Sequence, residues 1–245
     1  MSASTDTATI GELVAERPAR SRLFEKLGFD YCCGGKKTLE QACRARGLDP
    51  ATVAALLNES NADPNTGAVD VSAMSLTQLA DHIEQTHHAY LKDELPRLHR
   101  LIQKIAAKHG PDNPELTQLP RVYAAFRSEL ELHMAKEERV LFPLIRQIED
   151  RASGGSLHCG GIENPIRVME IEHQHAGDAL SHMRRITDDF NTPQSACNTY
   201  RAVMHSLIEL EADLHQHVHK ENNILFPRAV AMVGTQTLSK PIART

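Results

Sequence analysis

The chain has 245 residues and is 41% hydrophobic but only 4% aromatic, without Trp, so it can bury a core that must be mainly aliphatic. Its formal net charge of -5 argues against a nucleic-acid partner, because such proteins usually present a basic face. No apolar run approaches the roughly 20 residues that span a bilayer, and residues 1–11 lack the features of a secretion signal, so we expect a soluble cytoplasmic protein.

Residues 1–62 predict a small helical N-terminal domain. Its expected helices have recognisable start and stop signals: 17–26 before Gly28, then a helix that runs from the capping box Thr38–Gln41 to Gly47, and then 50–58 after Asp49. A turn with the sequence DYCCGG occupies residues 30–35. Residues 63–74 are polar and contain Pro and Gly, so they are predicted to be a linker.

Residues 75–235 predict a second domain made of long helices. A capping box at Ser75–Gln78 opens the first, and Pro or Gly clusters separate the others, which are expected at about 75–108, 115–150, 164–190 and 192–232. No strand alternation is found in this region. The fold class is therefore all-α: an antiparallel four-helix bundle preceded by the small helical domain.

The second and fourth of these helices carry near-copies of one motif. His133 and Glu137, like His217 and Glu221, form His-x-x-x-Glu followed by Leu-Phe-Pro, and the copies are 84 positions apart. That offset indicates an internal duplication of a helix pair. The first and third helices should then also match, and His88 and His173 are 85 positions apart.

The spacing of the motif explains how it could hold metal. Residues i and i+4 project from one helix face, so each histidine points the same way as its glutamate, within an apolar stripe. A buried carboxylate is costly unless it is paired or metal-bound. Four histidines and two glutamates without thiolate suit iron, manganese or zinc, and paired sites in helical bundles are usually di-iron. We therefore expect two iron ions bridged by Glu137 and Glu221, with positions left for an oxo or hydroxo bridge and a small ligand.

The other histidines are not predicted to bind the metal directly. His88 is preferred to His87 because of the repeat register and because Leu91 and Leu95 share its face. Several neighbours are interpreted as supporting the ligands, as exposed or as merely helical: His82, His87, His175, His215 and His219. The rest are assigned to the surface: His99, His109, His158, His182 and His205.

Five cysteines, two of them adjacent, do not form a secreted disulfide framework, so we expect free thiols in a reducing compartment. Cys32 and Cys33 lie in the turn before Lys36 and Lys37. They are interpreted either as low-pKa thiolates that react or bind a soft metal, or as a buried pair that fills a small core. Cys43 could approach the pair, whereas no role is assigned to Cys159 and Cys197.

The string DYCCGGK at residues 30–36, joined to the doubled His-x-x-x-Glu motif, resembles the repair-of-iron-centres family of iron–sulfur cluster repair proteins. The resemblance covers nearly the whole chain. It implies a hemerythrin-like bundle whose di-iron ligands match the six residues selected by the repeat, with Cys32 and Cys33 as the family's functional cysteine pair. It also implies repair of clusters damaged by nitric oxide or oxidative stress, by donating iron.

Three functions from different classes remain open at this point. The chain could supply iron to proteins with damaged clusters, or it could be a hemerythrin-like protein that scavenges, senses or reduces nitric oxide or binds dioxygen. A third reading is a helical bundle without a metal role. No membrane or nucleic-acid partner is expected, and the sequence leaves the oligomeric state open, a homodimer included.

Overall fold

The structure is a computed structural model that describes residues 8–60, 71–152 and 161–238. All regular structure in these ranges is helical, apart from one isolated antiparallel bridge between Thr9 and Thr38, so the all-α prediction is confirmed. Most of the predicted linker, and the loop with His158 and Cys159, lie outside the described residues. Within those ranges, no helix combines the length and the apolar character that crossing a membrane requires.

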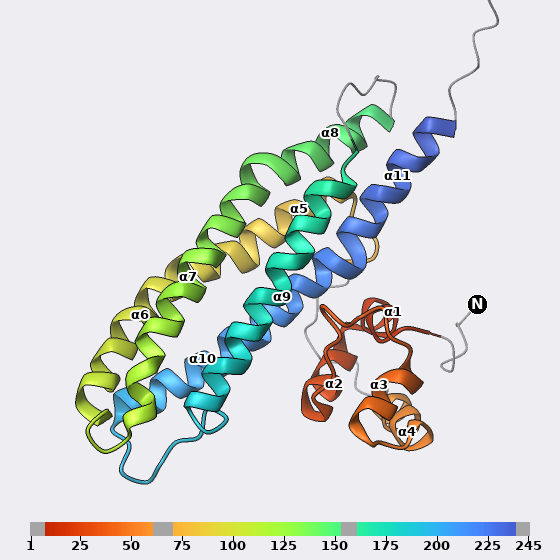
Figure 1. Cartoon of the computed structure of the whole chain (residues 1–245). Helices are drawn as coiled ribbons and strands as arrows, with labels where there is room; N and C mark the ends of the chain where they lie inside the picture. Colours follow the sequence, from red (N-terminus) through yellow and green to blue (C-terminus); the bar gives the residue numbers. More distant parts are fainter. Residues whose placement is uncertain (1–7, 61–70, 153–160, 239–245) are drawn as a thin grey trace, which may run out of the picture. The chain divides into compact units, whose positions relative to one another are not determined.

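Contacts divide the chain into two compact units. The first unit comprises Met1–Ala80, Ile145–Ile162 and His215–Thr245, and the second comprises Asp81–Leu144 and Glu163–Leu214. The small helices near the N-terminus, labelled α1 to α4 in Figure 1, belong to the first unit. Their bounds are α1 Ile10–Glu16, the 3₁₀ turn η1 Pro18–Arg20, α2 Ser21–Leu27, α3 Leu39–Arg46 and α4 Pro50–Ser60.

These four helices enclose an apolar core of their own. Phe24 is fully buried, and its ring centroid lies 5.5 Å from that of Phe29 and 6.3 Å from that of Tyr31. Aliphatic side chains from α1 and α4 complete the cluster, among them Ile10, Val14, Val53 and Leu57. A small core of this size buries enough apolar surface to order short helices that would be marginal alone.

Local signals account for most helix ends in this part. Thr38 and Gln41 form the predicted capping box, and Gly28 and Gly47 end α2 and α3 in the left-handed conformation with φ of 68° and 66°. Helix α1 was not predicted, although Thr9 and Glu12 form a second capping box. The polar composition of the first residues concealed a Thr-x-x-Glu signature that marks this start.

The remaining helices are long and nearly continuous. Their bounds are α5 Leu76–Ile83, η2 Glu84–His88, α6 Ala89–His109, η3 Pro114–Gln118, α7 Leu119–Lys136, η4 Glu137–Leu141, α8 Phe142–Ala152, α9 Glu163–Ile186, α10 Asn198–Lys220, η5 Glu221–Leu225 and α11 Phe226–Leu238. In the second unit, α7 packs against both α6 and α9, as Figure 1 shows. Apolar residues at helical spacing form the buried faces, for example Leu91, Leu95 and Leu98 on α6.

Two findings concern the starts of the long helices. Ser75 and Gln78 form the predicted capping box, with Gln78 N–H donating to Ser75 Oγ over 3.2 Å. The predicted start of the fourth helix at Thr192–Pro193 is wrong, because α10 begins at Asn198. The N–H of Ala196 donates to the carbonyl of Pro193, which closes a single turn that does not continue into the helix. Pro193 therefore starts a turn, and the local sequence does not distinguish the two outcomes.

Three π-helical turns interrupt the long helices, and the sequence did not predict them. They are η2, η4 and η5, each of five residues. A π turn adds one residue to a helical turn and is usually found at functional sites. Here η2 ends at His88, η4 begins at Glu137 and η5 begins at Glu221, so each coincides with a predicted metal ligand.

Candidate metal centre

The six predicted ligands are all buried. Their exposed fractions are 0% for His88, Glu137, His217 and Glu221, and 3% for His133 and His173. Two groups of buried side chains have the geometry to hold a metal ion, and together they contain these six residues and no others: His88, Glu137, His217 and Glu221 in one, and His133, Glu137, His173 and Glu221 in the other. The duplication therefore selected residues with the geometry that a metal site requires.

In the second unit, Glu137 lies beside histidines from two helices. Its Oε2 atom is 3.4 Å from Nε2 of His88 and 3.4 Å from Nε2 of His133. The Nε2 atoms of His133 and His173 are 3.0 Å apart. One ligand atom from each of His133, Glu137 and His173 lies within 4.8 Å of the others. This separation places nitrogen and oxygen donors around a common point, as a metal ion requires.

The first unit holds the second copy of the motif. Nε2 of His217 lies 3.0 Å from Oε1 of Glu221, and both side chains are fully buried. The i,i+4 spacing places the imidazole and the carboxylate on one helix face, as the sequence predicted. The π turn η5 begins at Glu221, just as η4 begins at Glu137, so the backbone repeats the duplication seen in the sequence.

Two further carboxylates hydrogen-bond to two of the predicted ligand histidines. Glu138 lies 2.8 Å from Nδ1 of His88, and Glu172 lies 2.9 Å from Nδ1 of His133. A carboxylate at Nδ1 keeps the proton on that nitrogen and leaves Nε2 free to bind a metal. In both rings Nε2 is the atom that faces Glu137. Neither glutamate was predicted from the sequence, although each is adjacent in sequence to a predicted ligand.

Each of these carboxylates also accepts a hydrogen bond from a lysine. Lys92 donates to Glu138 over 2.6 Å, and Lys136 donates to Glu172. Burial acts to raise the pKa of both glutamates, but hydrogen bonds from the lysine and the histidine outweigh burial and lower the pKa. Both carboxylates therefore stay ionised and continue to hold their histidines at neutral pH.

His87 is buried but belongs to neither group. Its side chain is 5% exposed, and Nδ1 lies 2.7 Å from Asp213 Oδ1. The structure thus gives His88 the geometry of a ligand and gives His87 a carboxylate partner on α10. The preference for His88, which relied on the repeat register, agrees with this geometry.

The donor atoms of the two groups fit iron. Four imidazoles and two carboxylates offer nitrogen and oxygen and no thiolate, which suits ions of intermediate softness. Two fully buried carboxylates are costly in an apolar interior, and a bound cation offsets that cost. The residues present therefore fit a metal centre of the kind expected from the sequence.

The cysteine pair forms a third group of potential ligands, in the first unit. Asp30, Cys32 and Cys33 each offer an atom within 4.8 Å of the others. Cys32 donates to Asp30 Oδ1 over 3.2 Å, and the two sulfur atoms are 4.0 Å apart. The hydrogen bond with Cys33 and burial raise the pKa of Cys32 well above its ordinary value. The interpretation as a low-pKa thiolate is therefore wrong for Cys32, because the hydrogen bond with Cys33, burial and Asp30 outweigh the exposed lysines that follow.

Side chains of η5 hold this turn by its backbone. Asn223 donates to the carbonyl oxygens of Cys32 over 3.0 Å and of Tyr31 over 3.2 Å, and Asn222 donates to that of Cys32 over 3.4 Å. A Cβ atom at Gly35 would come within 2.6 Å of the Tyr31 carbonyl and would overlap Asn223. The glycine after the cysteines is therefore required by the close approach of Asn223.

Tyr31 attaches the same turn to α10. Its hydroxyl donates to Glu25 over 2.8 Å and accepts from Gln216 over 2.8 Å, while its ring meets that of His219 edge-on at 5.5 Å. Burial, followed by the charge of Glu25, raises the pKa of Tyr31. Cys43, which the sequence left free to approach the cysteine pair or not, lies fully buried in the core of the small helices.

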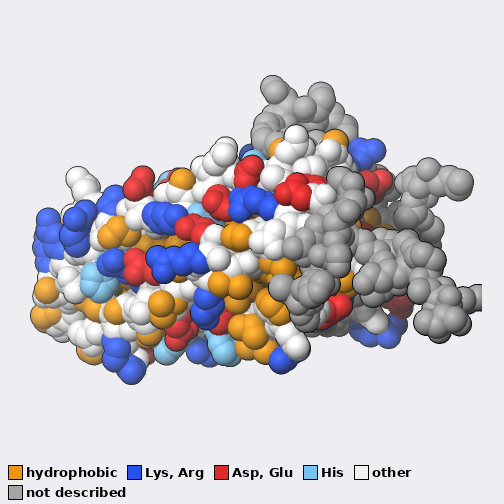
Figure 2. Space-filling view, turned by 90° about the horizontal axis from the view of Figure 1, so that it is seen from above, with side chains coloured by type: hydrophobic (Ala, Val, Ile, Leu, Met, Phe, Trp, Pro, Cys, Tyr) orange, Lys and Arg blue, Asp and Glu red, His pale blue; other side chains and the backbone are white. Residues whose placement is uncertain are grey.

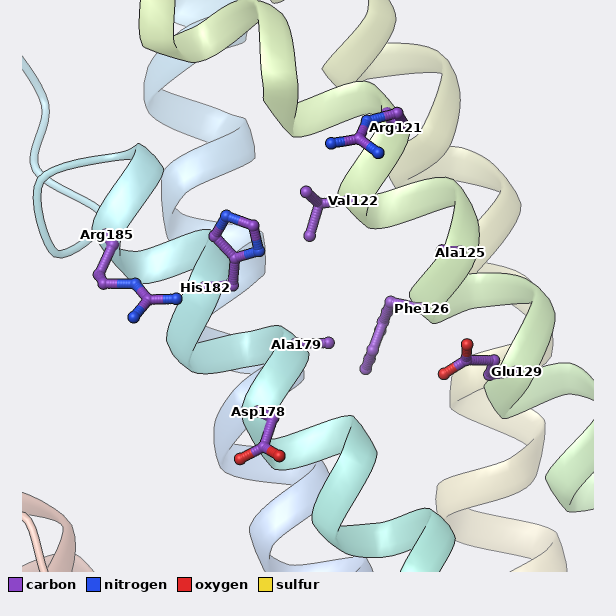
Figure 3. A pocket seen from close by; sticks show the side chains of 9 residues that line it. All are labelled: Arg121, Val122, Ala125, Phe126, Glu129, Asp178, Ala179, His182 and Arg185. Atoms are coloured by element: carbon purple, nitrogen blue, oxygen red, sulfur yellow. The ribbon is translucent and has the colours of Figure 1, made fainter.

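A surface hollow of about 460 Å³ lies between α7 and α9, and none of the six candidate ligands lines it. Figure 3 shows Arg121, His182 and Arg185 toward one end and Glu129 and Asp178 toward the other, with Phe126 between. The face drawn in Figure 2 likewise intersperses basic and acidic side chains.

Comparison with known proteins finds two domain families and a group of close relatives. Residues 79–229 match the hemerythrin HHE cation binding domain, and residues 6–61 match a domain of unknown function named ScdA_N. The chain is 38% identical to the iron–sulfur cluster repair protein YtfE of Edwardsiella ictaluri, over 91% of this chain and 97% of that protein. It is 37% identical to the YtfE protein of an Enterobacter species and 36% identical to that of Salmonella schwarzengrund, over 91% of this chain and 96% of each relative.

Proposed function

The chain belongs to the family of iron–sulfur cluster repair proteins that join this N-terminal domain to a hemerythrin-like helical bundle, and we propose that it repairs clusters damaged by nitric oxide or oxidative stress by supplying iron from a di-iron centre. The observation that carries the proposal is the pair of buried groups of histidines and glutamates. The proposed organisation is a small domain at 1–62, a linker at 63–74 and the bundle at 75–235.

Two metal ions rather than one are favoured by how the groups share residues. Glu137 and Glu221 belong to both groups, whereas each histidine belongs to one. This pattern is that of two ions bridged by two carboxylates, with His88 and His217 binding one ion and His133 and His173 binding the other. The iron pair, when bound, supplies positions for a small ligand and redox chemistry.

The two halves of the proposed centre differ in what surrounds them. Glu138 supports His88 in the first copy of the motif, and the equivalent position in the second copy is Asn222. Glu172 supports His133, and the position equivalent to Glu172 is His87. An amide and an imidazole carry less negative charge than two carboxylates, so the two copies of the motif are not equivalent. Each proposed ion still has one histidine supported by a carboxylate, His88 by Glu138 and His133 by Glu172.

Cys32 and Cys33 are proposed to take part in repair as soft ligands for iron or for a damaged cluster. They form a compact group with Asp30, and Asn223, two residues after Glu221, holds their turn. A soft metal lowers the pKa of a thiol that it binds. The raised pKa of Cys32 therefore keeps this thiol protonated until a metal arrives, which limits its oxidation between turnovers.

The proposal is tested by incubating the anaerobically purified, iron-loaded protein with an enzyme whose cluster has been damaged by nitric oxide. Recovery of the enzyme's activity together with loss of iron from this chain supports repair. Failure to restore activity, while nitric oxide still binds tightly, would identify a hemerythrin-like binder, and release of nitrous oxide would identify a reductase. About two iron atoms per chain would exclude the reading without a metal.

The double variant Cys32→Ala with Cys33→Ala separates the cysteines from the metal centre. We expect its iron content to match that of the unaltered protein, because neither thiol belongs to the two metal-binding groups, and its repair activity to fall. Repair activity equal to that of the unaltered protein would show that the cysteine pair only fills space in the core. The variant Cys43→Ala, altered at a cysteine buried in the same domain, is the control for loss of stability.

A further inference from the structure

Cys197, to which the sequence assigns no role, and His109, predicted to lie on the surface, form a pair in the second unit. Nε2 of His109, the last residue of α6, lies 3.2 Å from Sγ of Cys197, the residue before α10. Both side chains are partly exposed, and neither residue belongs to a metal-binding group. The pair therefore places a base next to a reachable nucleophile outside the site already described.

The helix that follows contributes further donors to the thiol. The carbonyl of Cys197 accepts from Arg201 N–H over 3.1 Å, so Cys197 stands at the N-terminus of the 23-residue helix α10. The backbone N–H groups of Tyr200 and Thr199 also hydrogen-bond to the thiol. Unsatisfied amides at a helix N-terminus stabilise a negative charge, so the imidazole and the helix favour the same ionised form.

The imidazole of His109 is held in place. Its ring meets the Tyr200 ring edge-on, with centroids 5.3 Å apart, and its backbone carbonyl accepts from the N–H groups of Asp112 and Asn113. The contact with His109, followed by the amide of Tyr200 and then the charge of Lys108, lowers the pKa of Cys197 to about 7. Arg201, the nearest charged residue on α10, donates to the carbonyl of Gln194.

We propose that Cys197, paired with His109, is a reactive thiolate that exchanges with small-molecule disulfides. The thiolate attacks one sulfur of the disulfide, a new bond forms between Cys197 and that sulfur, and the original sulfur–sulfur bond breaks. The second half leaves as a thiolate with the bonding electron pair and takes up a proton from solvent. The disulfide is the only oxidant required, and a second small thiol reverses the exchange.

Cys197 differs from the two buried cysteines of the described residues, Cys32 and Cys43. Cys43 is fully buried, and burial raises its pKa. Cys32 is buried as well, and its pKa is raised by Cys33 and by burial. A thiol with a pKa near the ambient pH reacts fastest in disulfide exchange. Cys197 combines that pKa with partial exposure, so it reacts before Cys32 and Cys43.

The test follows the reaction of the full, iron-loaded chain with dithiobis(nitrobenzoate), a disulfide that releases a coloured thiolate. We expect a fast phase that peptide mass spectrometry assigns to Cys197, with a rate that rises through a midpoint near pH 7. In His109→Gln the midpoint should move up by about one pH unit or more, and the rate at neutral pH should fall roughly tenfold. The control variant His205→Gln, at an exposed histidine of α10, should leave the midpoint and the rate at neutral pH unchanged.

Two outcomes would overturn the proposal. One is a fast phase of the same amplitude in Cys197→Ser, and the other is an unchanged midpoint in His109→Gln. Circular dichroism and iron content establish that each variant is folded and loaded. If Cys197→Ser does not fold, the midpoint measured for His109→Gln still tests the proposal, because that variant retains the thiol and removes only the imidazole.

Discussion

The side-chain amide of Asn223 donates to the carbonyl oxygen of Cys32 over 3.0 Å. Asn223 belongs to the π turn that begins with the proposed ligand Glu221, so one short segment carries a candidate metal-binding carboxylate and a group that fixes the cysteine turn. This contact connects the cysteine turn with the second His-x-x-x-Glu motif, and it can be tested without altering either of them.

Replacing Asn223 with Asp should loosen the cysteine turn. The carboxylate has no N–H and would face the carbonyl oxygens of Tyr31 and Cys32, so we expect a loss of about 1–3 kcal/mol in the free energy of unfolding. Alkylation of Cys32 and Cys33 should become faster, while the iron content stays close to that of the unaltered protein. The matched control is Asn58→Asp at an exposed position of α4; equal alkylation rates in the two variants would contradict the role of Asn223.

Removing a shared glutamate should cost more iron than removing a histidine. Glu137→Ala deletes a ligand that belongs to both groups, whereas His88→Ala deletes one that belongs to a single group. We expect Glu137→Ala to retain little iron and His88→Ala to retain about half, as measured by elemental analysis after anaerobic loading. Equal iron contents in the two variants would argue against bridging by Glu137.

Neutralising the carboxylates behind the histidines should weaken iron binding without abolishing it. Glu138→Gln and Glu172→Gln each remove the acceptor that orients Nδ1 of a ligand histidine. Such partners typically contribute 10- to 100-fold to metal affinity, so iron should pass to a chelator roughly that much faster. Glu131→Gln breaks only an ion pair with Arg127 on the exposed side of α7 and is the control. A change no larger than in that control would show that the histidines need no such support.

The start of α5 should depend on Glu149 and on pH. Glu149 accepts from the backbone N–H groups of Leu76 and Thr77 over 2.8 and 2.9 Å. Burial opposes ionisation, but these hydrogen bonds outweigh it and lower the pKa of Glu149. A lowered pKa in the folded state stabilises the protein above the ordinary pKa of Glu, and this contribution is lost as the pH falls below it.

We therefore expect Glu149→Ala to lower the free energy of unfolding by about 1 kcal/mol at neutral pH, as for a lost helix cap. The difference from the unaltered protein should shrink from about pH 4.5 downward, where the carboxylate takes up a proton. Denaturant unfolding at several pH values measures this difference in the free energy of unfolding. The variant Asp150→Ala, altered at an exposed neighbouring residue, is the reference. If the difference in the free energy of unfolding stays the same in acid, the ionised carboxylate of Glu149 does not cap α5.

Sequence reasoning was most reliable where the determinants are local. The i,i+4 spacing of His133 and Glu137, and of His217 and Glu221, is a property of any α-helix, and the 84-residue offset relates the two copies without a structure. The capping boxes at Thr38 and Ser75 were likewise predicted, because a cap involves only residues three positions apart. The same logic predicts α1, whose capping box at Thr9 had been overlooked.

Other features depend on contacts between residues far apart in sequence. Glu172 supports His133 across 39 positions, and Asn223 reaches Cys32 across 191. Neither contact leaves a periodic pattern, because a single side chain at a distant helix is enough to make it. The raised pKa of Cys32 was missed in part for the same reason: the hydrogen bond with Cys33 is local, but burial, the next largest cause, is a property of the assembled core.

The sequence by itself thus determined the all-α fold class and six candidate ligands, because helical periodicity and an internal repeat are patterns in the order of the residues. Only the tertiary structure decided which carboxylates orient the histidines, where the helices take a π turn, and which cysteine is activated. Cys32 stands in a motif and is buried with a raised pKa, whereas Cys197 stands in none and has a pKa near 7 because the end of α6 brings His109 to it. The pKa of a thiol depends on the charges and solvent around it, and those are set when distant helices pack together.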